Sequence, residues 1–331
     1  MKFGIRFIQF VGSPRECVDL AVLAEEAGFD SVWFPHDTFM HNTWVLTSAV
    51  AEHTRRIQIA NVGTNPYTTD PAEIATYFGT LDELSQGRAL LGLGVHTRDM
   101  VEWTGIDASD VIERTRSAVD IIRRLFRGET VVDGGPAYNW TDQCYLRFEP
   151  FRREIPIYVG AFGPEYLALS GEIGDGSLPM ITPPESAPVM VEAIHAGARG
   201  VGRNPSEVDI TGCAWLSLSE DASAATEVMR KMCAYFGPYL EDAAMSTVGL
   251  SRADFADQLR LVQENRYEEA FASVTEPMLK LGINGTPDDV IERIRYLESQ
   301  GVTHVSLGGP LGPDAAEAIR LMGEYVIPAF S

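Results

Sequence analysis

Residues 57–94 read IQIANVGTNPYTTDPAEIATYFGTLDELSQGRALLGLG, and this stretch decides the class of fold. It contains two short β-rich runs, residues 57–61 and 89–93, on either side of an amphipathic helical pattern over residues 72–84. A strand, a helix and a second strand in this order form the repeating unit of a parallel sheet. The stretch therefore predicts an α/β fold.

The same alternation continues to both ends of the chain. Eight strands are predicted, at residues 2–9, 31–34, 57–61, 89–93, 155–159, 177–180, 208–218 and 304–307. Further helical patterns cover residues 15–26, 44–52, 111–126, 165–172, 186–199 and 313–325. Eight strands separated by amphipathic helices predict a (β/α)8 TIM barrel, in which each helix packs its apolar stripe on the outside of the barrel.

Two segments are longer than a minimal barrel requires. Residues 95–154 include a Gly-Gly-Pro turn at 134–136 and an aromatic run that could form a hairpin, and residues 220–286 contain about three helical patterns. No low-complexity linker isolates either segment. Both are therefore interpreted as insertions in a single barrel domain that spans residues 1–331.

Composition narrows the classes of partner. The chain has 26 basic and 47 acidic residues and a formal net charge of −21, a field that repels nucleic-acid phosphates and anionic membrane surfaces. Its four cysteines lack metal-binding spacing, and its amino terminus lacks the apolar stretch of a signal peptide. These features predict a cytoplasmic protein with no nucleic-acid or membrane partner.

Candidate catalytic residues follow the predicted strands, because a TIM barrel carries its chemistry at the carboxyl ends of its strands. His36 and Asp37 follow the second strand, and His96 and Thr97 follow the fourth. Histidine titrates near neutral pH, so His36 and His96 are candidates for transferring a proton, and Asp37 could orient one of them. A structural hydrogen-bonding role is the alternative for each histidine.

Glycines recur at the same strand ends, at Gly63, Gly92, Gly94, Gly160 and Gly163. Glycine lets the backbone bend or approach a flat ligand closely, although any one of them could simply end a strand. Pro164 follows Gly163 at the expected first position of a helix, and the free backbone amides in the first turn of that helix would suit a phosphate. No Gly-x-Ser-x-Gly, His-Glu-x-x-His or Walker motif supports a hydrolase or an NTPase.

Six segments carry a resemblance to a known family. They are MKFGI, AEEAGFDSVWF, GTNPYTTDPAEIAT, TLDELSQGRALLGLG, IPIYVGAFGPEYLALSGEIGDG and GVTHVSLGGPLGPDAAEAI. In order and spacing they resemble the F420-dependent methylenetetrahydromethanopterin reductases and their bacterial relatives, within the bacterial-luciferase-like superfamily of barrels. The resemblance covers nearly the whole chain.

The resemblance implies a barrel mouth that binds the deazaflavin F420, with its phosphate near Gly163. It also implies a non-prolyl cis peptide bond at Val62-Gly63, in a bulge that supports the ring from behind. The cofactor-binding positions it implies are Val62, Gly63, Thr64, Asn65, Tyr67, Gly92, Gly94, Val95, Gly160, Ala161, Phe162 and Gly163.

Three positions depart from the reductase pattern. The chain has Arg6 in place of a glutamate in the first strand, His36-Asp37 in place of Asp-His, and Thr97 in place of an aspartate. The resemblance thus extends to the cofactor scaffold more than to the pterin substrate. Arg6 would favour an anionic or carbonyl-bearing substrate. Thr97 and Trp44 are the other candidates for contact with the substrate.

The expected function is an F420-dependent oxidoreductase that transfers a hydride between the deazaflavin and a small organic substrate, in a homo-oligomer. One alternative is an FMN-dependent monooxygenase, because barrels of this superfamily accept either cofactor. The other is a cofactor-binding protein without catalysis, which the lost acidic residues would fit. Trp44 could cover the cofactor ring, although core packing is the commoner role of tryptophan.

Overall fold

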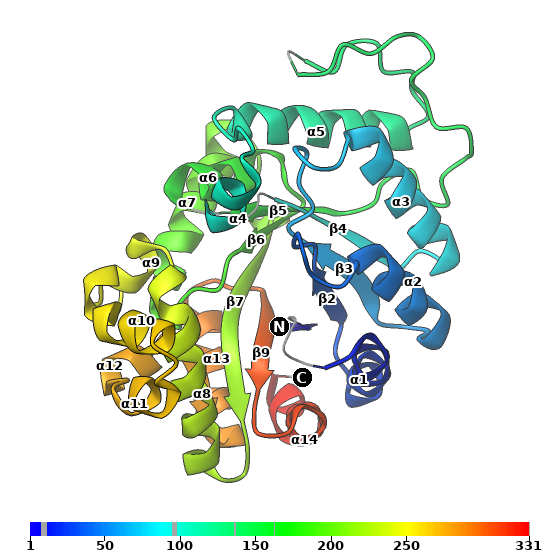
Figure 1. Cartoon of the computed structure of the whole chain (residues 1–331). Helices are drawn as coiled ribbons and strands as arrows, with labels where there is room; N and C mark the ends of the chain where they lie inside the picture. The colour runs from blue at the N-terminus through cyan, green and yellow to red at the C-terminus, as the bar shows by residue number, and fades with distance from the viewer. Residues whose placement is uncertain (8–11, 95–97, 136, 162, 331) are drawn as a thin grey trace.

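The computed structural model describes residues 1–7, 12–94, 98–135, 137–161 and 163–330 (Figure 1). In this part of the chain nine strands alternate with helices. The strands are β1 (Lys2–Arg6), β2 (Ser31–Pro35), β3 (Gln58–Val62), β4 (Ala89–Leu93), β5 (Ile157–Ala161), β6 (Gly176–Pro179), β7 (Asp209–Leu218), β8 (Gly282–Gly285) and β9 (His304–Leu311).

Helices surround these strands on the outside (Figure 1). They are α1 (Pro14–Ala27), α2 (Thr43–His53), α3 (Pro71–Leu84), α4 (Arg98–Thr104), α5 (Val111–Phe126), α6 (Gly163–Ile173), α7 (Ala187–Gly200), α8 (Ala222–Phe236), α9 (Asp242–Ser246), α10 (Ala256–Gln263), α11 (Tyr267–Ala272), α12 (Glu276–Leu279), α13 (Pro287–Ser299) and α14 (Ala315–Leu321). Among the described residues, none of these helices has the length and apolar character that crossing a membrane requires.

Eight of the strands close into a parallel barrel, which confirms the predicted TIM barrel. The pairings run from β1 through β2, β3, β4, β5, β6 and β7 to β9, and β9 pairs with β1 to complete the ring. The ninth strand, β8, was not predicted; it pairs with the second half of β7, from Trp215↔Gly282 to Leu218↔Gly285. Its sequence, Gly-Ile-Asn-Gly, is too short to show the alternation that marks a strand.

The prediction that a hairpin could form after Gly134 is wrong. Residues 127–135 and 137–156 contain turns and bends but no strand within the described part of the chain. Side chains hold this segment in place instead: the Arg152 guanidinium donates to the carboxylate of Asp82, which is fully buried on α3, with a shortest N–O distance of 2.6 Å. The aromatic run therefore follows the barrel without forming a sheet of its own.

Local capping positions the segment between β3 and α3 at the barrel mouth. The Asn65 side-chain oxygen accepts hydrogen bonds from the amides of Tyr67 and Thr68, at 3.1 and 3.0 Å, which folds the chain back in a turn. Asp70 then caps α3 by accepting from the Ala72 amide at 2.8 Å, and Pro71 occupies the first turn of the helix.

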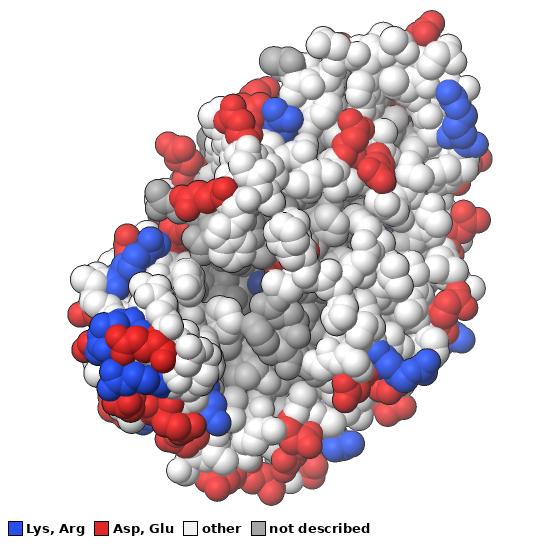
Figure 2. All heavy atoms as spheres, in the orientation of Figure 1, with Lys and Arg blue, Asp and Glu red and all other residues white. Residues whose placement is uncertain are grey.

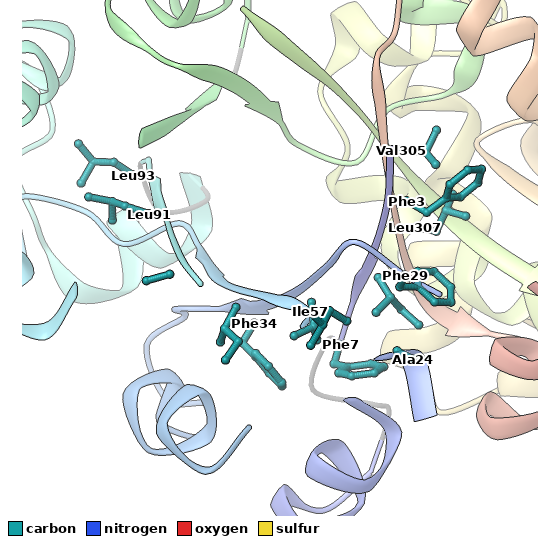
Figure 3. Close-up of a cluster of buried hydrophobic side chains, with 14 of the residues drawn as sticks. Phe3, Phe7, Ala24, Phe29, Phe34, Ile57, Leu91, Leu93, Val305 and Leu307 are labelled. Carbon is teal, nitrogen blue, oxygen red and sulfur yellow. The ribbon is translucent and has the colours of Figure 1, made fainter. Parts of the chain in front are cut away.

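The main hydrophobic core lies between the barrel and its helices, and Figure 3 shows part of it on the strands and adjoining segments. A second cluster, with Trp215, Met229 and Phe255, lies under the helices that follow β7. In Figure 1 these helices, α8 to α12, gather on one side of the barrel beside β7. A third cluster fills the barrel interior around Trp33, Leu90 and Tyr158.

Polar side chains close the amino-terminal end of the barrel interior. The buried His304 ring lies 3.1 Å from Ser31 Oγ and 3.3 Å from Asp209 Oδ2, and Trp33 Nε1 donates to the same Ser31 oxygen at 2.8 Å. A side chain at Gly4 would come within 2.9 Å of Ser31, Trp33 and His304, so glycine is required there. Side chains fill the amino-terminal end of the barrel interior. The carboxyl end is therefore where a ligand site is sought.

Candidate functional site

Arg6 and Asp37 carry opposite charges at the carboxyl end of the barrel, close enough for the charge of Arg6 to act on the Asp37 carboxyl, and we refer to them as the charged pair. Arg6 is the last residue of β1 and is only 3% exposed. Its Nη2 donates to Cys213 Sγ at 2.8 Å, and its Nε has no hydrogen-bond partner among the described residues. Burial raises the pKa of the Asp37 carboxyl to about 6, and the positive charge of Arg6 opposes that rise.

The side chains of His36 and Asp37, the two residues after β2, lie in different surroundings. The His36 amide donates to Val62 O at 2.7 Å, so the chain is still paired with β3 at this point. Successive side chains of an extended segment point to opposite faces. The His36 ring accordingly packs against Trp44 of α2, with ring centroids 5.3 Å apart, while Asp37 interacts with Arg6.

Trp44, a predicted substrate contact, lies against the helices. Its ring stacks on Tyr77 of α3, with centroids 4.3 Å apart and planes 15° apart, and meets the edge of Phe78 at 5.2 Å. The structure thus brings Arg6 and Asp37 together and places His36 and Trp44 in an aromatic contact between β2, α2 and α3. The packing role of this tryptophan is the one the geometry favours.

A bend at Gly63 follows β3 without the cis peptide bond that the family resemblance implied. Within the described residues the cis peptide bond is Gly309-Pro310, and the bond between Val62 and Gly63 is trans. Gly63 makes the bend with a left-handed φ of 81°, which glycine adopts without steric cost. Beyond it Thr64 pairs with β4, because its amide donates to Gly92 O and its carbonyl accepts from Gly94.

The rim glycines divide into two groups. A Cβ on Gly92 would lie 2.1 Å from Asn61 O, and one on Gly94 would lie 3.3 Å from the Cα of Gly160, so these three allow close strand packing. Among the described residues other than its chain neighbours, a Cβ on Gly63 or on Gly163 would meet no atom within 4 Å. With respect to that part of the chain, these two glycines leave space that a ligand could use.

Several buried polar atoms near the strand ends have no hydrogen-bond partner within the described part of the chain: Arg6 Nε, Asn61 Nδ2, Thr64 Oγ1 and Tyr67 Oη. An unpaired buried polar group costs about 1–3 kcal/mol, and native proteins usually supply such a group with water, an ion or a ligand. Their concentration around β1 and β3 makes this part of the mouth the candidate ligand site.

Tyr67 is held in place by its surroundings. The guanidinium of Arg114 lies over its ring, 4.9 Å from the centroid. Burial raises the pKa of the Tyr67 phenol, which keeps it protonated and able to donate a hydrogen bond at neutral pH. Val62, another of the predicted cofactor-binding residues, lies at the end of β3 and is buried as well.

Four predicted site residues, Val95, His96, Thr97 and Phe162, lie outside the described residues. Ala161 ends β5, where its backbone pairs with Pro179 of β6.

Cys213 is a site residue that the sequence analysis missed. It lies on β7 inside the barrel, and burial raises the pKa of its thiol although Arg6 acts in the opposite direction. A neutral thiol thus accepts the hydrogen bond from Arg6. Every residue of β7 after Asp209 is buried, so its hydrophobic pattern does not show which side chains point inward.

Figure 2 shows the surface around the mouth. The viewed face is hollowed near its centre, a small blue area is visible inside the hollow, and red and blue side chains lie mainly around the periphery.

A closed parallel barrel with a charged pair and unpaired polar groups at the carboxyl ends of its strands belongs to the class of TIM-barrel enzymes. Within that class, the chain belongs to the luciferase-like monooxygenase family, whose model matches residues 1–304.

Two relatives and one solved structure extend this assignment. The chain is 35% identical to 5,10-methylenetetrahydromethanopterin reductase of Archaeoglobus fulgidus over 99% of both chains. It is 28% identical to an F420-dependent glucose-6-phosphate dehydrogenase of Microbacterium testaceum, over 99% of this chain and 97% of that one. The structure of the coenzyme F420 dependent tetrahydromethanopterin reductase from Methanopyrus kandleri superposes with a TM-score of 0.94 at 27% identity, covering 100% and 99% of the two chains. The predicted resemblance to this reductase branch is confirmed.

Proposed function

We propose that the chain is an F420-dependent oxidoreductase that transfers a hydride between the deazaflavin and a small organic substrate. The observation that carries the proposal is the similarity of the chain over its full length to F420-dependent enzymes, with Arg6, Asp37 and Gly63 at the ends of strands of the same barrel. The charged pair can bind and protonate a substrate, and the space at Gly63 leaves room for a planar ring.

The residues of the mouth fit the cofactor. Gly63 leaves free the face against which a deazaflavin ring would lie, and Thr64 Oγ1 and Tyr67 Oη are buried polar atoms that could bond to its heteroatoms. Gly163 opens the start of α6, where backbone amides suit a phosphate. Bound F420 would supply a hydride at one carbon of its ring.

Arg6 and Asp37 are assigned the substrate chemistry. The Arg6 guanidinium, fixed by its bond to Cys213, can donate hydrogen bonds to a carbonyl or carboxylate oxygen of the substrate. Asp37, with a pKa of about 6, can hold a proton or accept one near neutral pH. We therefore assign Asp37, ahead of His36, as the group that exchanges a proton with the reacting oxygen.

Cofactor titration tests the proposal. The purified chain is mixed with F420 or with FMN, and binding is followed by the absorbance and fluorescence of each. We expect saturable binding of F420, and hydride exchange between reduced F420 and members of a panel of carbonyl, imine and alcohol compounds. Binding of FMN in place of F420, with oxygen consumed as substrate is oxidised, would make the chain a monooxygenase and overturn the proposal.

Three further expectations complete the proposal: a single domain, a cytoplasmic location and a homo-oligomeric state. Sedimentation velocity of the purified chain measures the last of these. A single species at the monomer mass, at micromolar concentration, would contradict the homo-oligomer.

A further inference from the structure

An apolar cavity lies beside the barrel mouth, outside the Arg6–Asp37 pair. Its walls come from the start of α6, the residues that follow β6, the helix α7 and the short helix α9. The apolar side chains that line it include Leu167, Met180, Ile181, Met190 and Ala244.

Two polar side chains of the cavity wall, Ser186 and Thr247, already have hydrogen-bond partners. Ser186 Oγ lies 3.0 Å from Thr247 Oγ1, which also donates to the carbonyl of Ala244. At the rim, Val189 and Tyr239 are 66% and 54% exposed. Large apolar side chains exposed around an apolar cavity are typical of a ligand site. The wall therefore suits an apolar group.

Ile181 connects this cavity with the charged pair. It lines the cavity, and it also lies near Arg6, since a Cβ placed on Gly308 would be 3.5 Å from Arg6 Cβ and 3.7 Å from Ile181 Cδ1. Ile181 packs against both the barrel interior and the cluster under α8 to α12. About one side chain thus separates the cavity from Arg6, a gap that a small molecule can span.

The size of the cavity restricts what it can hold. Its volume is about 170 Å³, close to the roughly 150 Å³ of an apolar cavity that binds benzene, whereas sites for whole drug-sized ligands measure roughly 300–1,000 Å³. It accommodates one ring or a short alkyl chain, not a tricyclic cofactor. Gly163 and Pro164, at the proposed phosphate position, form one edge of the cavity, and its two charged lining residues, Glu241 and Arg252, are exposed, so the apolar group would occupy the part lined by Met180, Ile181 and Met190.

We propose that this cavity binds the apolar part of the substrate. The substrate is then an amphipathic small molecule, with its reacting oxygen at Arg6 and Asp37 and an alkyl or aryl group in the cavity. This inference rests on the proposed function for the position of the reacting oxygen. The affinity of the cavity for an apolar group is independent of F420.

The test uses straight-chain 2-alkanones of four to nine carbons as probes. Dissociation constants are measured by titration calorimetry, with the cofactor-free chain and with the chain saturated in oxidised F420. We expect affinity to rise about fourfold per methylene, which corresponds to about 0.8 kcal/mol, until the cavity is full. An affinity independent of chain length in both forms would overturn the proposal. Failure of F420 to bind would overturn the proposed function. The titrations of the cofactor-free chain would then decide whether the cavity binds an apolar group.

Matched variants locate the probe. Ala244→Leu fills the cavity and should abolish the increase with chain length, whereas Ala222→Leu, an exposed position on α8 that does not line the cavity, should preserve it. Met180→Ala enlarges the cavity and should move the best chain length upward by one or two carbons, which keeps the test decisive if Ala244→Leu fails to fold. A loss of F420 affinity in Ala244→Leu with an unchanged alkanone series would assign the cavity to the cofactor instead.

Discussion

Arg6 and Cys213 are 207 residues apart in the chain, yet Nη2 of the arginine donates a hydrogen bond to Sγ of the cysteine at 2.8 Å inside the barrel. The parallel barrel produces this contact, because β9 pairs with β1 on one edge and with β7 on the other. The bond fixes the guanidinium below the mouth, with Asp37 as its neighbouring charge.

Replacing Arg6 by Met should weaken substrate recognition and leave the cofactor in place. Hydrogen bonds to a charged group contribute about 1.5–3 kcal/mol, so kcat/KM should fall roughly 10- to 100-fold. The F420 dissociation constant should change less than about twofold. Steady-state kinetics and F420 fluorescence measure the two quantities, and an unchanged kcat/KM would remove Arg6 from the site.

The pH profile should report the ionisation of Asp37. Reduction of a carbonyl needs the protonated acid, so its kcat/KM should fall as the pH rises through about 6, and oxidation of the alcohol should rise through the same pH. Because Arg6 lowers the pKa of Asp37, the Arg6→Met variant should move this step to higher pH. A profile of Asp37→Asn that keeps the step would assign it to another group.

The same pKa predicts a gain in stability for Asp37→Asn. The folded-state pKa of about 6 lies above the ordinary value of 3.8, so the folded state binds the proton more tightly and the wild type loses stability as pH rises from about 4 to 6. Above pH 7 the loss amounts to up to about 3 kcal/mol. Urea unfolding at pH 4 and pH 7.5 measures the free energy of unfolding. The variant should be more stable than the wild type at pH 7.5 only. An equal difference at both pH values would contradict the shift.

Gly63→Ala should impair cofactor binding more than folding. Its left-handed φ costs a non-glycine residue roughly 1–2 kcal/mol, and the new methyl group would project into the space proposed for the ring. Gly28→Ala, after α1, is the control, since Gly28 also has a positive φ and open space. Both variants should lose similar stability, but only Gly63→Ala should lose F420 affinity, by at least about tenfold. Equal F420 affinity in the two variants would remove Gly63 from the cofactor site.

Alkylation should distinguish the cysteines. Burial raises the pKa of the thiols of Cys17, Cys213 and Cys233, whereas Cys144 is partly exposed. Because the thiolate is the reacting form, iodoacetamide at pH 8 should label Cys144 first in the folded chain, and all four cysteines after denaturation. Peptide mass spectrometry measures the order, and early labelling of Cys213 would contradict its burial.

The candidate site was predictable in part. The rule that barrel chemistry lies at carboxyl strand ends predicted Asp37 and Gly63, because that rule depends only on where strands end, whereas Arg6 was predicted from the family resemblance. It did not separate Asp37 from His36, since one residue decides which face of the strand a side chain occupies. It also missed Cys213, whose role depends on a contact with a residue at the other end of the chain.

The order of apolar and polar residues by itself determined the barrel, because burying eight strands and their helices requires periodicities that the local sequence must carry. Only the tertiary structure decided that β8 joins the sheet, that the Gly134 segment forms no hairpin, and that Gly63 turns through a positive φ with a trans bond. These features depend on partners distant in sequence, whose close packing and charge select among conformations that the local chain permits equally.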